Sequence, residues 1–242
     1  MIITNGLTKK YKNITAVDSV NLQIKENETF ALLGLNGAGK TTLIKMLCTL
    51  TTVTSGNATI CGYDLKTEQE KIKPILNISP QESAIAKNLT TKENLLFVAS
   101  LYGISKELAN QKAEELLKEF DLVEKSNVRA KNLSGGQMRR LSIALAIISE
   151  PKLLFLDEPT LGLDVKARKK LWSIIEKLKS KVTIILTTHY LEEVEYLADR
   201  VGIMDKGTMK IVGTVDDIIN QTKVNNFEEA FLKIVENGVE DD

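Results

Sequence analysis

Apolar and polar residues alternate in part along the first segments of the chain, as they do in half-buried strands. We predict strands at residues 2–7 and 16–24, and a third at the apolar run 29–33. Residues 25–28 are predicted to form a turn, and Asn27 suits its apex because Asn tolerates left-handed backbone better than most residues. A further strand and turn are predicted over residues 58–65. The N-terminal part is therefore predicted to be rich in β-structure.

The periodicity becomes helical after Gly34, and a longer helical region follows later in the chain. The apolar positions of the first helix, three and four residues apart, are Leu43, Met46, Leu47 and Leu50. From about residue 84 to about residue 150 the chain loses strand character, which indicates an inserted helical lobe. Thr90 and Glu93 have the spacing of a capping box that opens a helix there. The apolar face of the next helix is marked by Ala109, Ala113, Leu116, Leu117 and Phe120.

Strands and helices then alternate through the rest of the chain. We predict strands at 152–158 and 181–189, helices around 171–180 and 191–200, and a hairpin at 201–213. Short apolar strands alternating with helices are typical of an α/β fold with a parallel, doubly wound sheet that is buried on both faces. From about residue 226 to 242 we expect a helix and an acidic tail, with the helix packed on the body of a single domain, 1–242.

The composition is that of an ordinary globular protein of 242 residues, with 32 Lys+Arg, 32 Asp+Glu and one His. One His with Cys48 and Cys61 cannot form a His/Cys metal cage. The two cysteines favour a reducing, cytosolic compartment. A single disulfide between them is the alternative. The longest near-apolar run, Leu141–Ile148, is far shorter than the roughly 20 residues of a membrane span, and the N-terminus does not resemble a secretory signal. Zero net charge argues against nucleic acid as the main partner.

The segment GLNGAGKT follows the apolar run 29–33 and opens the first helix, which is the context of a phosphate-binding loop. Glycines there let backbone N–H groups face phosphates, and the helix N-terminus adds its positive dipole end. Lys40 is expected to reach the β- and γ-phosphates and Thr41 to hold magnesium. The alternative is a plain turn with an exposed lysine. The candidate ligand residues are Gly34, Asn36, Gly37, Ala38, Gly39, Lys40, Thr41 and Thr42.

Two adjacent carboxylates follow a second apolar strand. Leu153–Leu156 has the pattern of a strand buried on both faces, and Asp157 and Glu158 emerge at its carboxyl end. Doubly wound sheets bind ligands at that end. We expect Asp157 to bind magnesium and Glu158 to polarise an attacking water. Helix-capping or solvated surface residues are the alternative.

The segment LSGGQMRRLSIALAII begins at Leu133 and contains a second candidate anion site. Ser134 and Gln137 have the spacing of a capping box. That interpretation leaves Gly135 and Gly136 unexplained, because adjacent glycines are costly to order unless the backbone approaches something closely. A glycine-rich helix N-terminus can bind an anion. If two chains face each other, one triphosphate could therefore bind between this segment of one chain and the phosphate-binding loop of the other.

With these motifs, the chain resembles the nucleotide-binding subunits of ATP-binding cassette (ABC) transporters over nearly its whole length. NISPQE with Gln81, GLD ending in Asp164, TTHYLEE with His189 and TKKYKN with Tyr11 extend the resemblance. The resemblance implies a P-loop NTPase core with a parallel doubly wound sheet, an N-terminal antiparallel β subdomain and an inserted helical subdomain. It also implies a head-to-tail pair of cassettes, each ATP lying between one phosphate loop and the partner's LSGGQ, and we expect this pair to be a homodimer in the ATP-bound state.

The resemblance implies roles for four further residues. Gln81 would bind Mg²⁺ and link it to the docking site of the membrane partner, and Asp164 would communicate across the dimer. His189 would contact the γ-phosphate and Tyr11 would stack on adenine. Three of these residues have a structural alternative. Gln81 could be a turn residue, and His189 could be a hydrogen-bonded core or surface histidine. Tyr11 could be a partly buried aromatic residue of a strand. The basic run 166–170 is predicted to be a solvated helix face.

We therefore expect an ATPase subunit, with ATP and Mg²⁺ as cofactors, that powers export through a separate integral membrane permease. Parts of the sequence resemble subunits of bacterial drug, antibiotic, sodium or polysaccharide efflux systems. An importer ATPase, or a soluble ABC ATPase acting in translation or DNA repair, is the alternative. The expected location is the cytoplasmic face of the cell membrane, through the permease. The cargo is not revealed, because its path would lie in another polypeptide.

Overall fold

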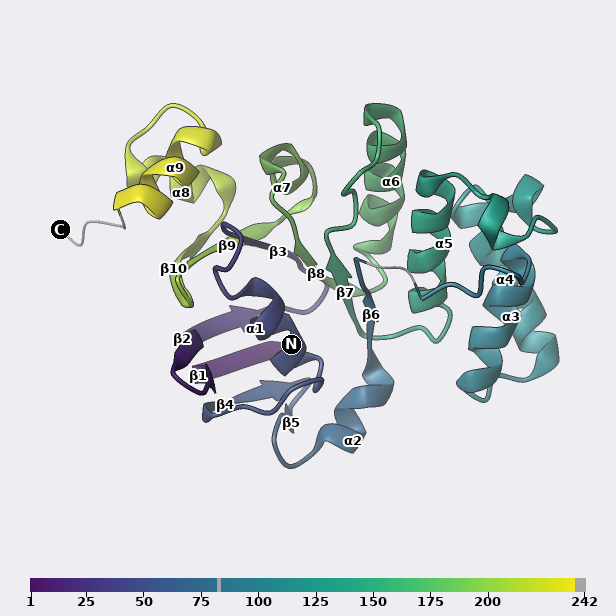
Figure 1. Ribbon diagram of the computed structural model, residues 1–242, viewed down its shortest axis with the longest axis horizontal. Coiled ribbons are helices and arrows are strands. Elements are labelled where there is room, and N and C mark those ends of the chain that lie inside the picture. The colour runs from purple at the N-terminus through teal and green to yellow at the C-terminus, as the bar shows by residue number, and fades with distance from the viewer. Residues whose placement is uncertain (82–83, 238–242) are drawn as a thin grey trace.

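The computed structural model describes residues 1–81 and 84–237 (Figure 1). The strands are β1 (Ile2–Tyr11), β2 (Ile14–Ile24), β3 (Thr29–Leu33), β4 (Ser55–Ile60), β5 (Tyr63–Asp64), β6 (Leu76–Ser79), β7 (Leu153–Asp157), β8 (Thr183–Thr187), β9 (Arg200–Asp205) and β10 (Thr208–Gly213). The α-helices are α1 (Lys40–Leu47), α2 (Gln69–Ile72), α3 (Thr91–Leu101), α4 (Lys106–Glu119), α5 (Gly135–Ile147), α6 (Val165–Leu178), α7 (Leu191–Leu197), α8 (Val215–Thr222) and α9 (Phe227–Asn237). Short 3₁₀ helices are η1 (Lys73–Ile75), η2 (Val123–Lys125) and η3 (Ala130–Asn132).

The central sheet has the strand order β10-β9-β3-β8-β7-β6. Every pair from β9 to β6 is parallel, and only β10 runs antiparallel to its neighbour β9. The predicted doubly wound sheet is confirmed, and the predicted hairpin supplies its antiparallel edge. Because β3, β7 and β8 are adjacent and parallel, their carboxyl ends meet at one edge of the sheet.

Alternating residues of the central strands enter two separate cores. Phe30 and Leu32 of β3 pack with α1 and with the antiparallel sheet β2-β1-β4-β5. Ala31 and Leu33 pack on the opposite side, in a core that includes residues of α3 to α7. This burial on both faces explains why β3 is apolar throughout. The antiparallel sheet confirms the expected N-terminal β subdomain.

The predicted helical lobe contains α3, α4 and α5, which lie together beyond the β6 edge of the sheet (Figure 1). The capping box of Thr90 and Glu93 is present at the start of α3. The apolar face predicted for α4, including Phe120 just after it, is buried. The lobe boundaries at about 84 and 150 remain a prediction.

Two details differ from the sequence pattern. The pattern did not predict β6, which is only four residues long and pairs with β7 alone among the described strands. Leu50 was expected on the apolar face of the first helix, but α1 ends at Leu47 and Leu50 is 63% exposed. Thr49 has a left-handed backbone, with φ of 60°, which ends the helical periodicity.

The last helix packs on the body of the protein, as predicted. Phe227 and Ile234 of α9 are buried, while Phe231 and Val235 are partly buried against the same core. Residues 238–242, the predicted acidic tail, lie outside the described residues. Among the helices of residues 1–81 and 84–237, none has both the length and the apolar character needed to cross a membrane.

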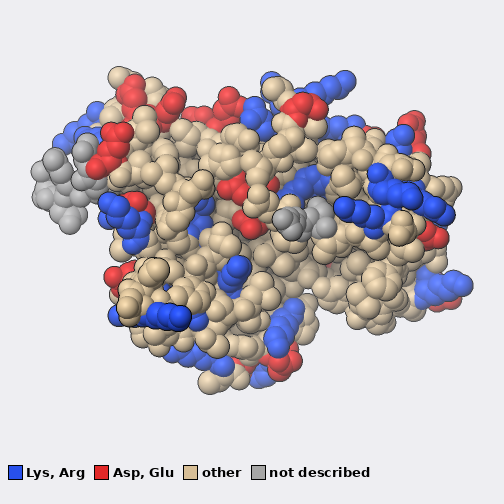
Figure 2. Space-filling view, viewed as in Figure 1, with Lys and Arg blue, Asp and Glu red and all other residues tan. Residues whose placement is uncertain are grey.

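Acidic and basic side chains are interspersed over the face shown in Figure 2. The basic run 166–170 lies in the first turns of α6, and most of it is exposed, as predicted. Two of its cations have acidic partners: Arg168 pairs with Glu192, and Lys170 pairs with Asp121.

Candidate functional site

The loop between β3 and α1 requires glycine at two positions. Gly39 has φ of +104°, and a Cβ there would lie 2.4 Å from the carbonyl oxygen of Ala16. Gly34 has φ of +154°, and a Cβ there would lie 2.3 Å from the carbonyl oxygen of Met204. Helix α1 begins without a capping side chain and without an acidic residue in its first turn. The positive end of this helix is therefore directed toward the loop without a protein anion on it.

Lys40 is not the exposed lysine of the alternative interpretation. It is 8% exposed, and its Nζ donates to the carbonyl oxygens of Gly34 at 2.6 Å and Leu35 at 3.2 Å. Burial lowers the pKa of Lys40, while the negative charges of Glu158 and Asp157 oppose that shift. The cation is thus held over the loop and faces two carboxylates across the site.

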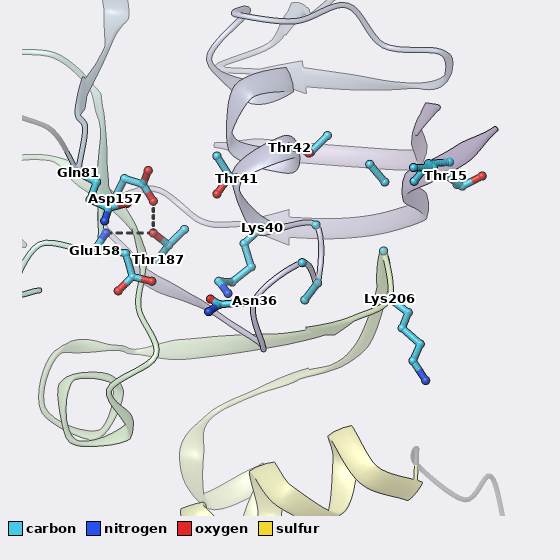
Figure 3. Close-up of a pocket in the computed structure, with 16 residues that line it drawn as sticks. Thr15, Asn36, Lys40, Thr41, Thr42, Gln81, Asp157, Glu158, Thr187 and Lys206 are labelled. Atoms are coloured by element: carbon cyan, nitrogen blue, oxygen red, sulfur yellow. Dashed lines mark hydrogen bonds between the residues drawn. The ribbon is translucent and has the colours of Figure 1, made fainter. Parts of the chain in front are cut away.

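Asp157 and Glu158 lie where β7 ends, and Thr187 of the adjacent strand β8 contacts both (Figure 3). The Thr187 hydroxyl donates to Oδ1 of Asp157 at 2.6 Å and accepts from the backbone N–H of Glu158 at 3.1 Å. The same N–H donates to the carbonyl of Thr187 at 3.1 Å. Glu158 has φ of 48°, a conformation that is uncommon for a residue with a side chain. Such backbone is found preferentially at functional sites.

A cavity of about 430 Å³ lies between the phosphate-binding loop and the end of β7. Predicted site residues that line it are Asn36, Gly37, Ala38, Gly39, Lys40, Thr41, Thr42, Gln81, Asp157 and Glu158. In Figure 3, Gln81, Asp157, Glu158 and Thr187 lie together on one side of Lys40. The structure therefore brings most of the predicted residues around one space. Gly34 contributes through its carbonyl, which accepts from Lys40.

Further residues that line this cavity were not predicted: Ile14, Thr15, Ala16, Thr187, Lys206 and Gly207. Thr187 had a usable signal, because it is a polar residue at the end of an apolar strand. The others come from the start of β2 and from the β9–β10 turn. Nothing in those segments of the sequence indicates a ligand, and only the fold brings them to the loop.

His189 and Tyr11 are not among the residues that line the cavity. Nδ1 of His189 lies 2.9 Å from Oε2 of Glu158, so the imidazole adjoins the site through that carboxylate. Tyr11 is 45% exposed at the end of β1, and Nζ of Lys9 lies 4.9 Å from its ring centroid. Its cross-strand neighbour Ile14 lines the cavity instead.

The second glycine-rich segment forms the start of α5. The Ser134 side chain accepts from the N–H of Gln137 at 3.3 Å, and Oε1 of Gln137 accepts from the N–H of Ser134 at 2.9 Å. A Cβ at Gly136 would lie 3.1 Å from Cβ of Ala167, so packing against α6 explains that glycine. A Cβ at Gly135 would meet nothing within 4 Å. Packing within the chain therefore leaves Gly135 unexplained.

This segment opens onto a different cavity, of about 400 Å³. Its lining residues are Ser134, Gly136, Gln137, Arg140, Asp164, Lys166, Ala167 and Lys170. Asp164 also caps α6, where its carboxylate accepts from the N–H of Ala167 at 2.9 Å. No lining residue is shared with the first cavity. One chain thus presents its two candidate phosphate-binding segments in separate places.

Comparisons with known proteins agree with this geometry. Residues 17–161 match the family model described as ABC transporter. The chain is 39% identical to the linearmycin resistance ATP-binding protein of Bacillus subtilis (strain 168), over 96% of this chain and 78% of that protein. It is 35% identical to the doxorubicin resistance ATP-binding protein of Mycobacterium tuberculosis (strain ATCC 25618 / H37Rv), over 99% of this chain and 72% of that protein.

Solved structures show the same fold. An ATP binding subunit of an ABC transporter superposes with a TM-score of 0.86 at 30% identity, covering 97% of this chain and 99% of the other. A dimeric ATP-binding cassette in a post-hydrolysis state, bound to ADP and Pi, superposes with a TM-score of 0.79 at 28% identity, covering 88% and 98%. The sequence motifs, the site geometry and these similarities agree: the chain belongs to the ABC transporter family and is an ATP-binding, ATP-hydrolysing subunit of it.

Proposed function

We propose that this ATPase powers export of a substrate through a separate membrane permease, by ATP-driven pairing of two cassettes. The observation that carries the proposal is the convergence of Lys40, Asp157 and Glu158 on one cavity, with Ser134 on another. The relatives' names, which refer to linearmycin and doxorubicin resistance, favour export over import. They also favour transport over roles in translation or DNA repair.

In the first cavity, the N–H groups of the loop and the N-terminus of α1 would bind the phosphates of ATP. Lys40 would neutralise charge on the β- and γ-phosphates. The hydroxyl of Thr41, the carboxylate of Asp157 and the amide oxygen of Gln81 line the same space, and these oxygen donors fit Mg²⁺. The ion would supply charge neutralisation on the phosphate oxygens. Stacking of Tyr11 on adenine remains a proposal, because Tyr11 lies outside the cavity lining.

Glu158 is the residue that we assign to the attacking water. Its carboxylate would accept a proton as the water oxygen bonds to the γ-phosphorus and the bond to the β,γ-bridging oxygen breaks, which yields ADP and inorganic phosphate. His189, 2.9 Å from that carboxylate, would contact the γ-phosphate and help to orient Glu158. The end of β8 places Thr187 against Asp157, and His189, two residues after the strand, lies against Glu158.

The second cavity supports pairing of cassettes. Ser134 lies at a helix N-terminus that is open at Gly135, and the cavity there shares no lining residue with the cavity at the chain's own phosphate-binding loop. A second cassette facing head-to-tail would place its ATP there, and Asp164 on the rim would communicate across the interface. The dimeric relative bound to ADP and Pi supports this arrangement. The partner in this proposal is a second copy of this chain.

The permease is proposed to contact the surface of α3. Phe97 and Leu101 are 50% and 68% exposed one helical turn apart, and Tyr102 follows at 46%. The hydroxyl of Tyr102 donates to Oδ1 of Asn77 at 2.7 Å, which joins this surface to β6, the strand that leads to Gln81. Exposed apolar clusters of this kind are typical of protein interfaces. The subunit would thereby be peripheral on the cytoplasmic face of the membrane.

The first experiment is Glu158→Gln, tested for ATP binding and for steady-state hydrolysis. Loss of a positioned base lowers turnover by about 10²- to 10⁴-fold in general, whereas the amide keeps the size of the side chain. We expect ATP affinity close to that of the wild type and a rate lower by that factor. Hydrolysis at the wild-type rate would refute the assignment of Glu158.

The second experiment tests the shared site with Ser134→Asp in the Glu158→Gln background. Aspartate caps helices as well as serine does, so α5 should persist, but its charge would repel a phosphate. We expect unchanged ATP binding by the monomer and loss of ATP-dependent dimerisation in analytical ultracentrifugation. Thr214→Asp, at the cap of α8, is the matched control. Dimerisation that survives Ser134→Asp would contradict the proposed pairing.

The third experiment identifies the partner by purifying the tagged chain from detergent-solubilised membranes. An integral membrane protein that co-purifies would support the transport proposal, and loss of that protein with Leu101→Glu would support the α3 surface. Ribosomes or DNA-repair proteins in its place would overturn the proposal.

A further inference from the structure

Arg139 is a buried cation that binds backbone rather than an acid. It lies on α5, two residues after Gln137, and is 7% exposed. Each guanidinium nitrogen donates to a backbone carbonyl: Nε to Pro159 at 2.8 Å, Nη1 to Pro80 at 2.5 Å and Nη2 to Asp157 at 2.7 Å. One side chain of the helical lobe therefore holds two separate loops of the sheet.

The bound peptides are those next to the proposed reacting groups. The carbonyls of Asp157 and Pro159 lie on either side of Glu158, whose φ of 48° is uncommon for a residue with a side chain. Backbone in such a conformation persists when its surroundings hold it in place. The third carbonyl, that of Pro80, belongs to the residue before Gln81. Arg139 thus fixes the backbone that carries Glu158 and the backbone that carries Gln81.

Acidic side chains near Arg139 favour its charged form. Burial lowers the pKa of Arg139, and the negative charges of Asp157, Glu193 and Glu158 oppose that shift. A guanidinium presents its donors in a rigid planar fork, whereas a lysine ammonium is a compact charge on a flexible stem. Lysine could keep the charge at this position but could not reach three carbonyls in the same geometry.

We propose that Arg139 is a positioning residue for ATP hydrolysis, which ties α5 to the backbone on both sides of Glu158 and to the peptide before Gln81. This proposal rests on the proposed role of Glu158. Its consequence is mechanical: Ser134 caps the N-terminus of α5, so a displacement of α5 when Ser134 meets a partner's ATP is transmitted through Arg139 to the chain's own Glu158. The residue acts through Glu158 and Gln81 and does not itself touch the nucleotide.

The test compares Arg139→Lys and Arg139→Gln with Arg200→Lys. Arg200 is a suitable control because its Nη1 donates to the carbonyl of Gln23 and to Glu28, away from the cavity. We expect both Arg139 variants to lower kcat about 10- to 100-fold, the scale of a 1 Å misplacement, with KM for ATP changed less than threefold. Arg200→Lys should keep the wild-type kcat. Arg139→Gln removes the charge, so it covers the case in which Arg139→Lys fails to fold.

A double-mutant cycle with Glu158→Gln separates positioning from a general structural effect. If Arg139 acts through Glu158, adding Arg139→Lys to Glu158→Gln lowers the residual single-turnover rate by less than twofold. A loss as large as in the wild-type background, or a kcat within twofold of wild type for both Arg139 single variants, would overturn the proposal. Wild-type turnover by Glu158→Gln would instead overturn the proposed role of Glu158.

Discussion

Thr187→Val is the sharpest test of how the two acids are held, because valine keeps the shape of threonine and removes only the hydroxyl. Thr187 is 1% exposed, and its hydroxyl donates to Asp157 at 2.6 Å. Loss of a hydrogen bond to a charged group costs about 1.5–3 kcal/mol. Asp157 is only partly buried, so water can replace some of the lost interaction, and we expect about 1.5 kcal/mol. The N–H of Glu158 keeps its bond to the carbonyl of Thr187.

The assay is urea denaturation without nucleotide, followed by circular dichroism, with thermal unfolding in parallel. A cost of about 1.5 kcal/mol corresponds to a shift of about 3–6 °C in Tm for a chain of this size. Thr187→Ser should recover most of the loss because it keeps the hydroxyl. Thr222→Val, which removes the donation to the neutral helix carbonyls of Ile218 and Ile219, should cost less than about 1 kcal/mol. A change below about 0.5 kcal/mol in Thr187→Val, or equal losses in the Ser and Val variants, would refute the reasoning.

Three further predictions concern the phosphate-binding loop, the stacking of Tyr11 on adenine, and the buried acid Glu193. Gly39→Ala should weaken ATP binding at least tenfold in calorimetry, because its Cβ would clash with the carbonyl of Ala16; Gly62→Ala, where a Cβ meets nothing within 4 Å, should bind ATP like the wild type. Tyr11→Ala should raise KM for ATP about tenfold if the ring stacks on adenine, and an unchanged KM would remove that assignment. Burial raises the pKa of Glu193, so its stabilising contribution is complete below about pH 4.5 and is lost as pH rises through the folded-state pKa. The free energy of unfolding of Glu193→Gln should therefore fall less than that of the wild type over this range in urea titrations, and parallel curves would contradict it.

Most of the site on the phosphate side could be predicted because it is local in sequence. Gly34 to Thr41 lie between one strand and the helix that follows it, so the strand-loop-helix order alone indicates a phosphate-binding loop. The pair Asp157 and Glu158 was predicted in the same way, from an apolar strand that ends in two acids. The resemblance to a family added Gln81, Asp164, His189 and Tyr11. Of these, Gln81 lines the first cavity and Asp164 the second.

Contacts between distant segments could not be read from the sequence. Thr187 reaches Asp157 because β7 and β8 are neighbours in register, an arrangement decided by the order of strands in the sheet. Lys206 reaches the cavity on the β9–β10 turn. Arg139 was seen only as part of a helix after a glycine-rich segment, and nothing in its neighbours indicates three carbonyl acceptors from two other segments.

The sequence by itself determined the α/β class, the phosphate-binding loop and the two acids, because hydrophobic period and backbone requirements act over a few residues. Only the tertiary structure decided that Thr187 orients Asp157, that Arg139 holds the peptides around Glu158, and that Ser134 opens onto a cavity separate from Lys40. The physical reason is that a hydrogen bond acts over about 3 Å. Its partners are therefore chosen by strand order and helix packing, which bring together residues far apart along the chain.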